Sequence, residues 1–215
     1  MRGPRAAPIV VLALACLPAA AAVPAPGGAV TLPIDPGTSS LTFTIHRAGE
    51  TIDGRAREFA GEIDFNPADL SAGGSVTLRV VASALETGNR MRDRKMRGSH
   101  LEVERFPAIL FKSISIKVGS ERERRASPPA AGTLGSAPGG TQRRALVEGV
   151  LSLHGLDRTL LVPAAIRYDS GTLTAEGSVT LTYSEYGIPI PRFLWLVMDD
   201  EIVVRFRFVA VPAAR

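Results

Sequence analysis

The sequence predicts an all-β protein whose strands form one antiparallel barrel. Three observations support this prediction: apolar and polar residues alternate along successive short segments, turn sequences separate these segments, and only one interval has a helical composition. Each predicted strand has one apolar and one polar face, as an antiparallel sheet with one face in water requires. About eight such strands fit a meander that closes on itself, because closure removes the exposed edges of an open sheet.

The chain begins with a predicted secretory signal peptide, residues 1–22. Arg2 and Arg5 form a positive start, residues 9–17 form a short apolar core, and the alanines at 19–22 offer small-residue cleavage sites. The apolar core is much shorter than the roughly 20 residues that cross a bilayer, so we expect no transmembrane segment in the mature chain.

The only cysteine, Cys16, lies inside this predicted leader. Ordinary cleavage would leave a mature chain without a thiol, and hence without a disulfide, a cysteine nucleophile or a thiolate metal site. Leu14-Ala15-Cys16 also resembles a lipoprotein signal, but Ala13 stands where a larger aliphatic residue is usual. Cleavage after the alanines is therefore favoured, with lipid anchoring through Cys16 as the minor alternative.

The basic charge of the chain lies outside its predicted barrel. The formal net charge is +4, of which the leader holds +2 and residues 119–144 hold +3, so that the rest of the chain carries −1. A nearly neutral body has no electrostatic footprint for a phosphate backbone, which argues against nucleic acid as a partner.

The strands follow from alternation at a period of two residues. The apolar sets that alternate with polar residues are Leu41/Phe43/Ile45, Gly61/Ile63/Phe65, Val76/Leu78/Val80, Ile114/Ile116/Val118, Val179/Leu181/Tyr183 and Val204/Phe206/Phe208. Turn residues separate the runs, and Asp169-Ser170-Gly171 predicts a hairpin loop.

The segment from Phe106 to Ser113 predicts a strand with an irregularity. Pro107 cannot donate a ladder hydrogen bond, so it belongs at the first residue of a strand. Ile109 and Phe111 should share one face, but Ile114 breaks the alternation, which indicates a bulge near Ser113.

Two intervals depart from the strand pattern. Residues 91–97 are mostly charged and predict a short helix or turn over one barrel end, which we favour over a binding element. Residues 119–141 are rich in proline, glycine, alanine and serine, and predict a disordered loop insertion between two strands, within the range 119–144.

Several motifs together resemble the YceI-like family. They are F-A-G-E-I-D-F from Phe59, T-G-N-R-M-R-D from Thr87 and F-P-A-I-L-F-K-S from Phe106, with L-T-F-T-I-H before them and V-E-G-V-L-S-L-H-G after them. The resemblance implies a secreted bacterial protein with a lipocalin-like β-barrel, here residues 29–213, that holds a long isoprenoid or other lipid tail.

The resemblance and the alternation together give candidate site residues. The apolar cavity would be lined by Phe43, Ile45, Phe65, Leu78, Phe111, Leu153, Trp195 and Phe206. Trp195 could instead plug one barrel end. Polar residues expected at the mouth, near the ligand headgroup, are His46, Asn89, Arg92 and Asp93. For the last three we favour a structural role in pinning a lid-like connection.

The sequence contains no convincing catalytic or metal-binding pattern. The histidines at 46, 100 and 154 lack the local spacing of a zinc site, so structural hydrogen bonding is the favoured interpretation. Motifs of common hydrolases, nucleotide-binding loops and zinc proteases are missing from the sequence. We therefore expect a non-enzymatic protein without a cofactor.

The sequence hypothesis is an exported or periplasmic binding protein. Its ligand would be a polyprenyl chain, an isoprenoid quinone or a fatty-acid derivative. The alternatives are a structural or stress-related envelope protein with a side-chain-filled barrel and, less favoured, an enzyme that modifies a lipid or quinone. The oligomeric state is left open, with a homodimer as one option.

The four-alanine run predicts that the mature protein begins between Ala20 and Ala25. N-terminal sequencing of the exported protein measures this directly. A lipidated Cys16 at the N-terminus would contradict the prediction and make the protein membrane-anchored.

Deletion of residues 120–141 should leave the fold intact, because this segment lacks the apolar content to join a core. The measurement is the melting temperature of the shortened protein. A fall of more than a few degrees would show that the segment is a structural element.

Overall fold

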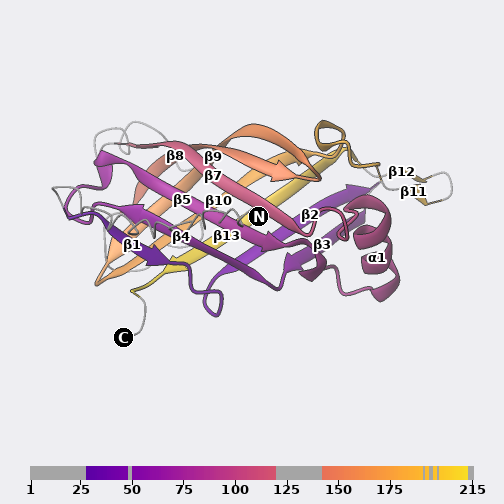
Figure 1. Cartoon of the computed structure of the whole chain (residues 1–215), viewed down its shortest axis with the longest axis horizontal. Helices are drawn as coiled ribbons and strands as arrows, with labels where there is room; N and C mark the ends of the chain where they lie inside the picture. The colour runs from indigo at the N-terminus through magenta and orange to yellow at the C-terminus, as the bar shows by residue number, and fades with distance from the viewer. Residues whose placement is uncertain are drawn as a thin grey trace, which may run out of the picture.

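The computed structural model describes residues 28–47, 50–119, 142–190, 192–193, 196–197 and 199–212, without the side chains of Arg47 and of residues 192–197. These residues form one curled antiparallel sheet with a short helix at one end (Figure 1). The predicted leader with Cys16, the bulk of the predicted insertion and Trp195 lie outside the described residues.

The all-β prediction is confirmed, but the number of strands is not. The described sheet has eleven strands in the order β1-β4-β5-β7-β8-β9-β10-β13-β2-β3-β6. Their bounds are β1 Val30–Pro33, β2 Ser40–Arg47, β3 Glu50–Ala56, β4 Phe59–Phe65, β5 Gly74–Val81, β6 Leu85–Glu86, β7 Ala108–Val118, β8 Arg143–Leu153, β9 Leu156–Asp169, β10 Thr172–Thr182 and β13 Glu201–Ala210. A separate hairpin pairs β11 (Arg192–Phe193) with β12 (Leu196–Val197).

The prediction of eight strands missed β1, β3 and β6 for one shared physical reason: the apolar alternation in each of them is weak or short. β1 has four residues and β6 has two. β3 is longer, but two of its three buried positions are Gly54 and Ala56, which add little to an apolar pattern.

The segment after β1 closes the curled sheet. β1 pairs with β4 on one side, and the backbone N–H of Ile34 donates to Gly61 O over 2.9 Å. On the other side Ile34 forms a bridge with Ala210 of β13, and the N–H of Asp35 donates to Val209 O over 2.8 Å. The chain thus joins β4 to β13, and the sheet encloses its apolar face.

The irregularity predicted in β7 is confirmed. The register of β7 on β8 shifts between Ser113 and Ser115, so Ile114 is an extra residue that points outward and is 63% exposed. The alternation was therefore wrong to group Ile114 with Ile116 and Val118, which line the interior. The hydroxyl of Ser113 accepts a hydrogen bond from the N–H of Val76 over 2.8 Å. Because the bulge restores the alternation, Ile116 returns to the inner face.

The predicted hairpin between β9 and β10 is also confirmed. Asp169 and Thr172 pair across a two-residue turn, in which Ser170 has φ 49° and Gly171 has φ 84°. Two successive positive φ angles are typical of the type I′ turn, whose twist matches that of the flanking strands.

One short helical segment lies at an end of the barrel, as predicted for residues 91–97. It consists of α1, Arg90–Lys95, followed by a π-helical turn, η3, Met96–His100 (Figure 1). Shorter 3₁₀ turns are η1 Leu70–Ala72, η2 Ala82–Ala84 and η4 Ser184–Tyr186. In the described ranges, no helix has the length and apolarity to cross a membrane.

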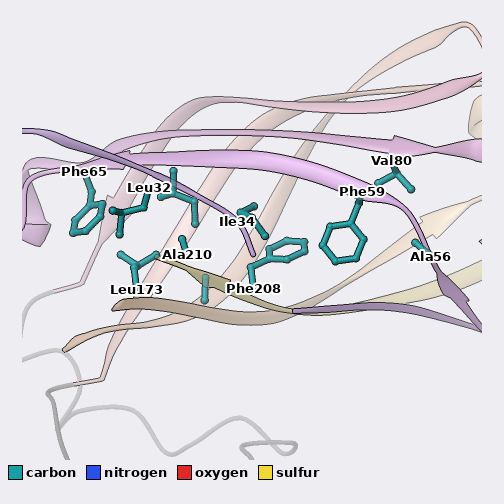
Figure 2. Packing of buried hydrophobic residues seen from close by; sticks show 11 residues of the cluster. Leu32, Ile34, Ala56, Phe59, Phe65, Val80, Leu173, Phe208 and Ala210 are labelled. Atoms are coloured by element: carbon teal, nitrogen blue, oxygen red, sulfur yellow. The ribbon is translucent and has the colours of Figure 1, made fainter. Parts of the chain in front are cut away.

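A solid apolar seam lies between the closing segment and the strands that face it. Figure 2 shows Phe59 of β4 opposite Phe208 of β13, with Ile34 beside them. The two phenylalanine rings are 5.9 Å apart between centroids and tilted by 55°. This seam holds the two sides of the sheet together.

Truncation of Phe59 to alanine should lower the free energy of unfolding by about 3–5 kcal/mol, the usual range for a buried phenylalanine. The side chain is buried in the seam. Leu161→Ala is the matched control, because Leu161 is 60% exposed on β9 and should change stability little. Urea unfolding of both variants measures the difference, and equal losses would contradict the role of the seam.

Candidate functional site

The inner face of the sheet encloses a cavity of about 690 Å³. This volume lies within the range of small-molecule sites, roughly 300–1,000 Å³. Leu78, Phe111 and Phe206 point inward but are only half-buried, because part of their surface faces the cavity rather than a neighbour. The interior of the barrel is therefore hollow.

Phenylalanine rings lie against glycines on the neighbouring strand, which keeps them at the cavity wall. A Cβ atom on each of these glycines would overlap the ring, so only glycine leaves the space that the ring occupies. The pairs are Phe43 at Gly54, Phe111 at Gly149 and Phe206 at Gly177, where such a Cβ would come within 2.1, 2.4 and 2.6 Å of the ring. With its ring against the wall, each phenylalanine adds apolar surface without filling the lumen.

Seven of the eight predicted cavity residues line this space; the eighth, Trp195, lies outside the described residues. The seven are Phe43, Ile45, Phe65, Leu78, Phe111, Leu153 and Phe206. The sequence did not lead us to expect the glycines that pack against the phenylalanine rings. The available signal was glycine at inward positions of otherwise alternating strands.

Residues of the T-G-N-R-M-R-D motif hold α1 at one end of the cavity. The side chain of Asn89 accepts hydrogen bonds from the N–H groups of Met91 and Arg92, both 3.1 Å, and so caps the helix. The Arg92 guanidinium donates to the hydroxyl of Thr87 over 2.7 Å and to its carbonyl over 3.1 Å. Asn89 and Arg92 both line the cavity.

Two residues predicted at the mouth are not among its lining residues. Asp93 is 7% exposed, and its carboxylate accepts hydrogen bonds from the N–H of Thr87 (2.8 Å) and from its hydroxyl (2.5 Å). It therefore fixes the connection and does not face a ligand. His46 is exposed, because it alternates with inward-facing Ile45 along β2, and its ring contacts the Thr51 hydroxyl over 3.4 Å.

The other two histidines bind the connection between β10 and β13. Nδ1 of His100 lies 2.9 Å from Pro189 O, and Nδ1 of His154 lies 3.0 Å from Tyr186 O. A carbonyl can only accept, so each Nδ1 carries the hydrogen. Burial lowers the pKa of His100, which favours its neutral form. These contacts fit the structural interpretation of the histidines.

Tyr186 forms the deepest part of the packing at this end. It is fully buried, and burial raises the pKa of its hydroxyl to about 12. It packs with Leu153, Leu181 and Ile188 in a second apolar cluster, which supports the cavity wall near α1. Among the described residues, no group of three or more histidine, cysteine or acidic side chains is placed to hold a metal.

The cationic groups of the lining are at one end. Arg92 and Lys95 of α1 line that end, together with Met91 and Met96. Asp64 of β4 also borders the cavity, but its carboxylate accepts hydrogen bonds from the hydroxyls of Thr31 and Ser75 on the outer face of the sheet. The sequence reasoning did not place Met91, Lys95 or Met96 at the mouth, although it noted a charged helix there. The arrangement suits a long apolar molecule with a polar or anionic group near α1.

Comparisons with known proteins agree with this fold. The crystal structure of BcnA from Burkholderia cenocepacia has a TM-score of 0.65 at 20% identity, covering 83% of this chain and 99% of that chain. A polyisoprenoid binding domain from Saccharophagus degradans has a TM-score of 0.62 at 15% identity, covering 83% and 97%. The YCEI protein of Campylobacter jejuni has a TM-score of 0.57 at 14% identity, covering 77% and 87%.

A search of curated protein sequences finds no match. The profile of the YceI-like domain, in contrast, matches residues 32–210, which is most of the chain and the whole of the described barrel except its outermost residues. The chain belongs to the YceI-like family.

Proposed function

We propose that this protein binds a long-chain apolar ligand inside its barrel. The ligand classes that fit are a polyprenyl chain, an isoprenoid quinone and a fatty-acid derivative. The observation that supports the proposal is the hollow, apolar interior of about 690 Å³. Each methylene that leaves water for such a cavity contributes about 0.8 kcal/mol, so ten of them contribute on the order of 8 kcal/mol before the entropy of association is subtracted.

The comparisons support the same ligand class. The related domain from Saccharophagus degradans is described as polyisoprenoid binding. At 15% identity this likeness concerns the fold, so the ligand of the present chain is argued from its own cavity. The cavity also argues against the alternative of a barrel filled by side chains.

The ends of the cavity suggest an orientation for the ligand. Arg92 and Lys95 place two cations at the α1 end, whereas the carboxylate of Asp64 is bonded to Thr31 and Ser75 on the outer face of the sheet. A phosphate, carboxylate or quinone oxygen would therefore lie beside α1, with the tail directed into the barrel. Loading would occur outside the cytoplasm if the predicted leader directs export.

A ligand of this kind should raise the melting temperature of the delipidated protein. At a hundredfold excess over the dissociation constant, binding to the folded state alone adds about 2.7 kcal/mol of stability. Melting scans with polyprenyl, quinone and fatty-acyl ligands make the measurement. If no ligand shifts the transition, the proposal is wrong.

Substitution of Gly54 by alanine should remove most of that shift. The new Cβ would lie 2.1–2.6 Å from three atoms of the Phe43 ring, so the ring must leave the wall and enter the lumen. The double variant Gly54→Ala/Phe43→Ala should regain binding, because the obstructing ring is gone. Gly98→Ala is the control, since a Cβ there meets no atom within 4 Å. Undiminished binding by a folded Gly54→Ala protein would place the ligand elsewhere.

A further inference from the structure

An exposed methionine lies among cations where the cavity reaches the surface. Met91 lines the cavity and is 82% exposed, more than any other large hydrophobic residue in the described ranges. From Arg90 to His100 the chain has five arginines or lysines and one carboxylate, Asp93. That carboxylate is buried and bonded to Thr87, so it offers no exposed counter-charge.

The helical geometry gathers the cations around the methionine. Arg94 and Lys95 follow Met91 by three and four residues, which places all three on one face of α1, and Arg90 precedes it. Arg90, Arg94 and Lys95 are exposed. In the described part of the chain, Arg90 and Arg94 form no ion pair. We call Arg90, Met91 and Arg94 the α1 rim; Lys95 beside it already interacts with another group of the protein.

Acidic residues that flank the α1 rim in sequence are paired with other cations. Glu86 accepts from Arg55 over 2.7 Å and from Arg57 over 2.6 Å. Glu102 pairs with Arg105. These carboxylates therefore do little to neutralise the rim.

The rim is also firmly held. Besides the bonds from Arg92 to Thr87, the Arg97 guanidinium donates to Leu85 O over 2.8 and 3.2 Å. Two arginines thus anchor the helical segment to the barrel, while Arg90 and Arg94 project from it. By contrast, the exposed Leu161 on the outer wall is paired across strands with the acidic Glu148.

We propose that the α1 rim docks on the surface of an anionic phospholipid bilayer, with the cations among the headgroups and Met91 at the edge of the acyl region. Charge complementarity and an apolar tip are the two attractions that hold a protein at such an interface. The purpose of docking rests on the proposed function. A ligand that moves between a bilayer and the cavity exposes part of its apolar chain to water. Each exposed methylene lowers the population of this intermediate state about fourfold. A mouth that faces the bilayer reduces the length of chain that is exposed.

The test is co-sedimentation of the delipidated mature protein with vesicles of phosphatidylcholine, with and without phosphatidylglycerol. The protein should bind the phosphatidylglycerol vesicles and bind pure phosphatidylcholine much more weakly. Added salt should weaken binding, because exposed charges are screened within about 10 Å at 0.1 M ionic strength. Equal binding to both vesicles, or no binding to either, overturns the proposal.

Variants locate the contact. Arg90→Gln/Arg94→Gln should weaken binding to phosphatidylglycerol vesicles roughly 25-fold, about fivefold for each cation. The matched control, Arg79→Gln/Lys112→Gln, removes the same charge from exposed positions on β5 and β7 and should bind as the parent does. An equal loss in both pairs would mean diffuse attraction and would overturn the assignment to α1.

A second pair of variants tests the apolar tip. Met91→Ser should weaken vesicle binding while leaving its salt dependence unchanged, whereas Leu161→Ser removes an exposed apolar side chain from the outer wall and should have no effect. Loading with polyprenyl, quinone or fatty-acyl probes from detergent solution separates this proposal from the proposed function. An Arg90→Gln/Arg94→Gln protein that loads normally but does not dock supports the docking proposal, because neither arginine lines the cavity. A parent that docks but never loads contradicts the proposed function alone. If the Met91→Ser protein docks as the parent does, the methionine takes no part in docking and the apolar half of the proposal is wrong.

Discussion

A sheet with one apolar face and no second layer can bury that face only against itself. This requirement explains why the short closing segment after β1 matters more than its length suggests. Ile34 pairs with β13 while the same residue donates to β4, so a few backbone hydrogen bonds join two distant parts of the sheet. The solid seam of Phe59, Phe208 and their neighbours then excludes water from the junction. Without closure there would be neither an inside nor a cavity.

Closure alone does not decide whether the inside is hollow. In small barrels the same interior can be filled by side chains or can hold one ligand. Here the largest inward side chains include phenylalanines whose rings rest on glycines of the next strand. The glycines remove the Cβ atoms that would otherwise push the rings toward the axis. The result is a lining that is aromatic and aliphatic but thin, which leaves about 690 Å³ for another molecule.

Polar residues at the α1 end serve the cavity indirectly. The side chains of Asn89, Arg92 and Asp93 form hydrogen bonds within the turn from Thr87 into α1. These bonds fix the position of the helix. His100 and His154 do the same for the connection that follows β10. A rigid mouth built in this way places Arg92 and Lys95 beside the cavity and leaves Arg90, Met91 and Arg94 facing outward.

The amino-acid sequence by itself determined which side of each long strand faces inward, where β7 is bulged and where β9 turns into β10. These features depend on neighbours along the chain, and alternation or a Ser-Gly turn reports them directly. Only the tertiary structure decided that β1, β3 and β6 belong to the sheet, that Asp93 is buried and that the barrel is hollow. The last depends on pairs such as Phe111 and Gly149, which belong to different strands, so the space above a glycine becomes visible only when register brings the two together.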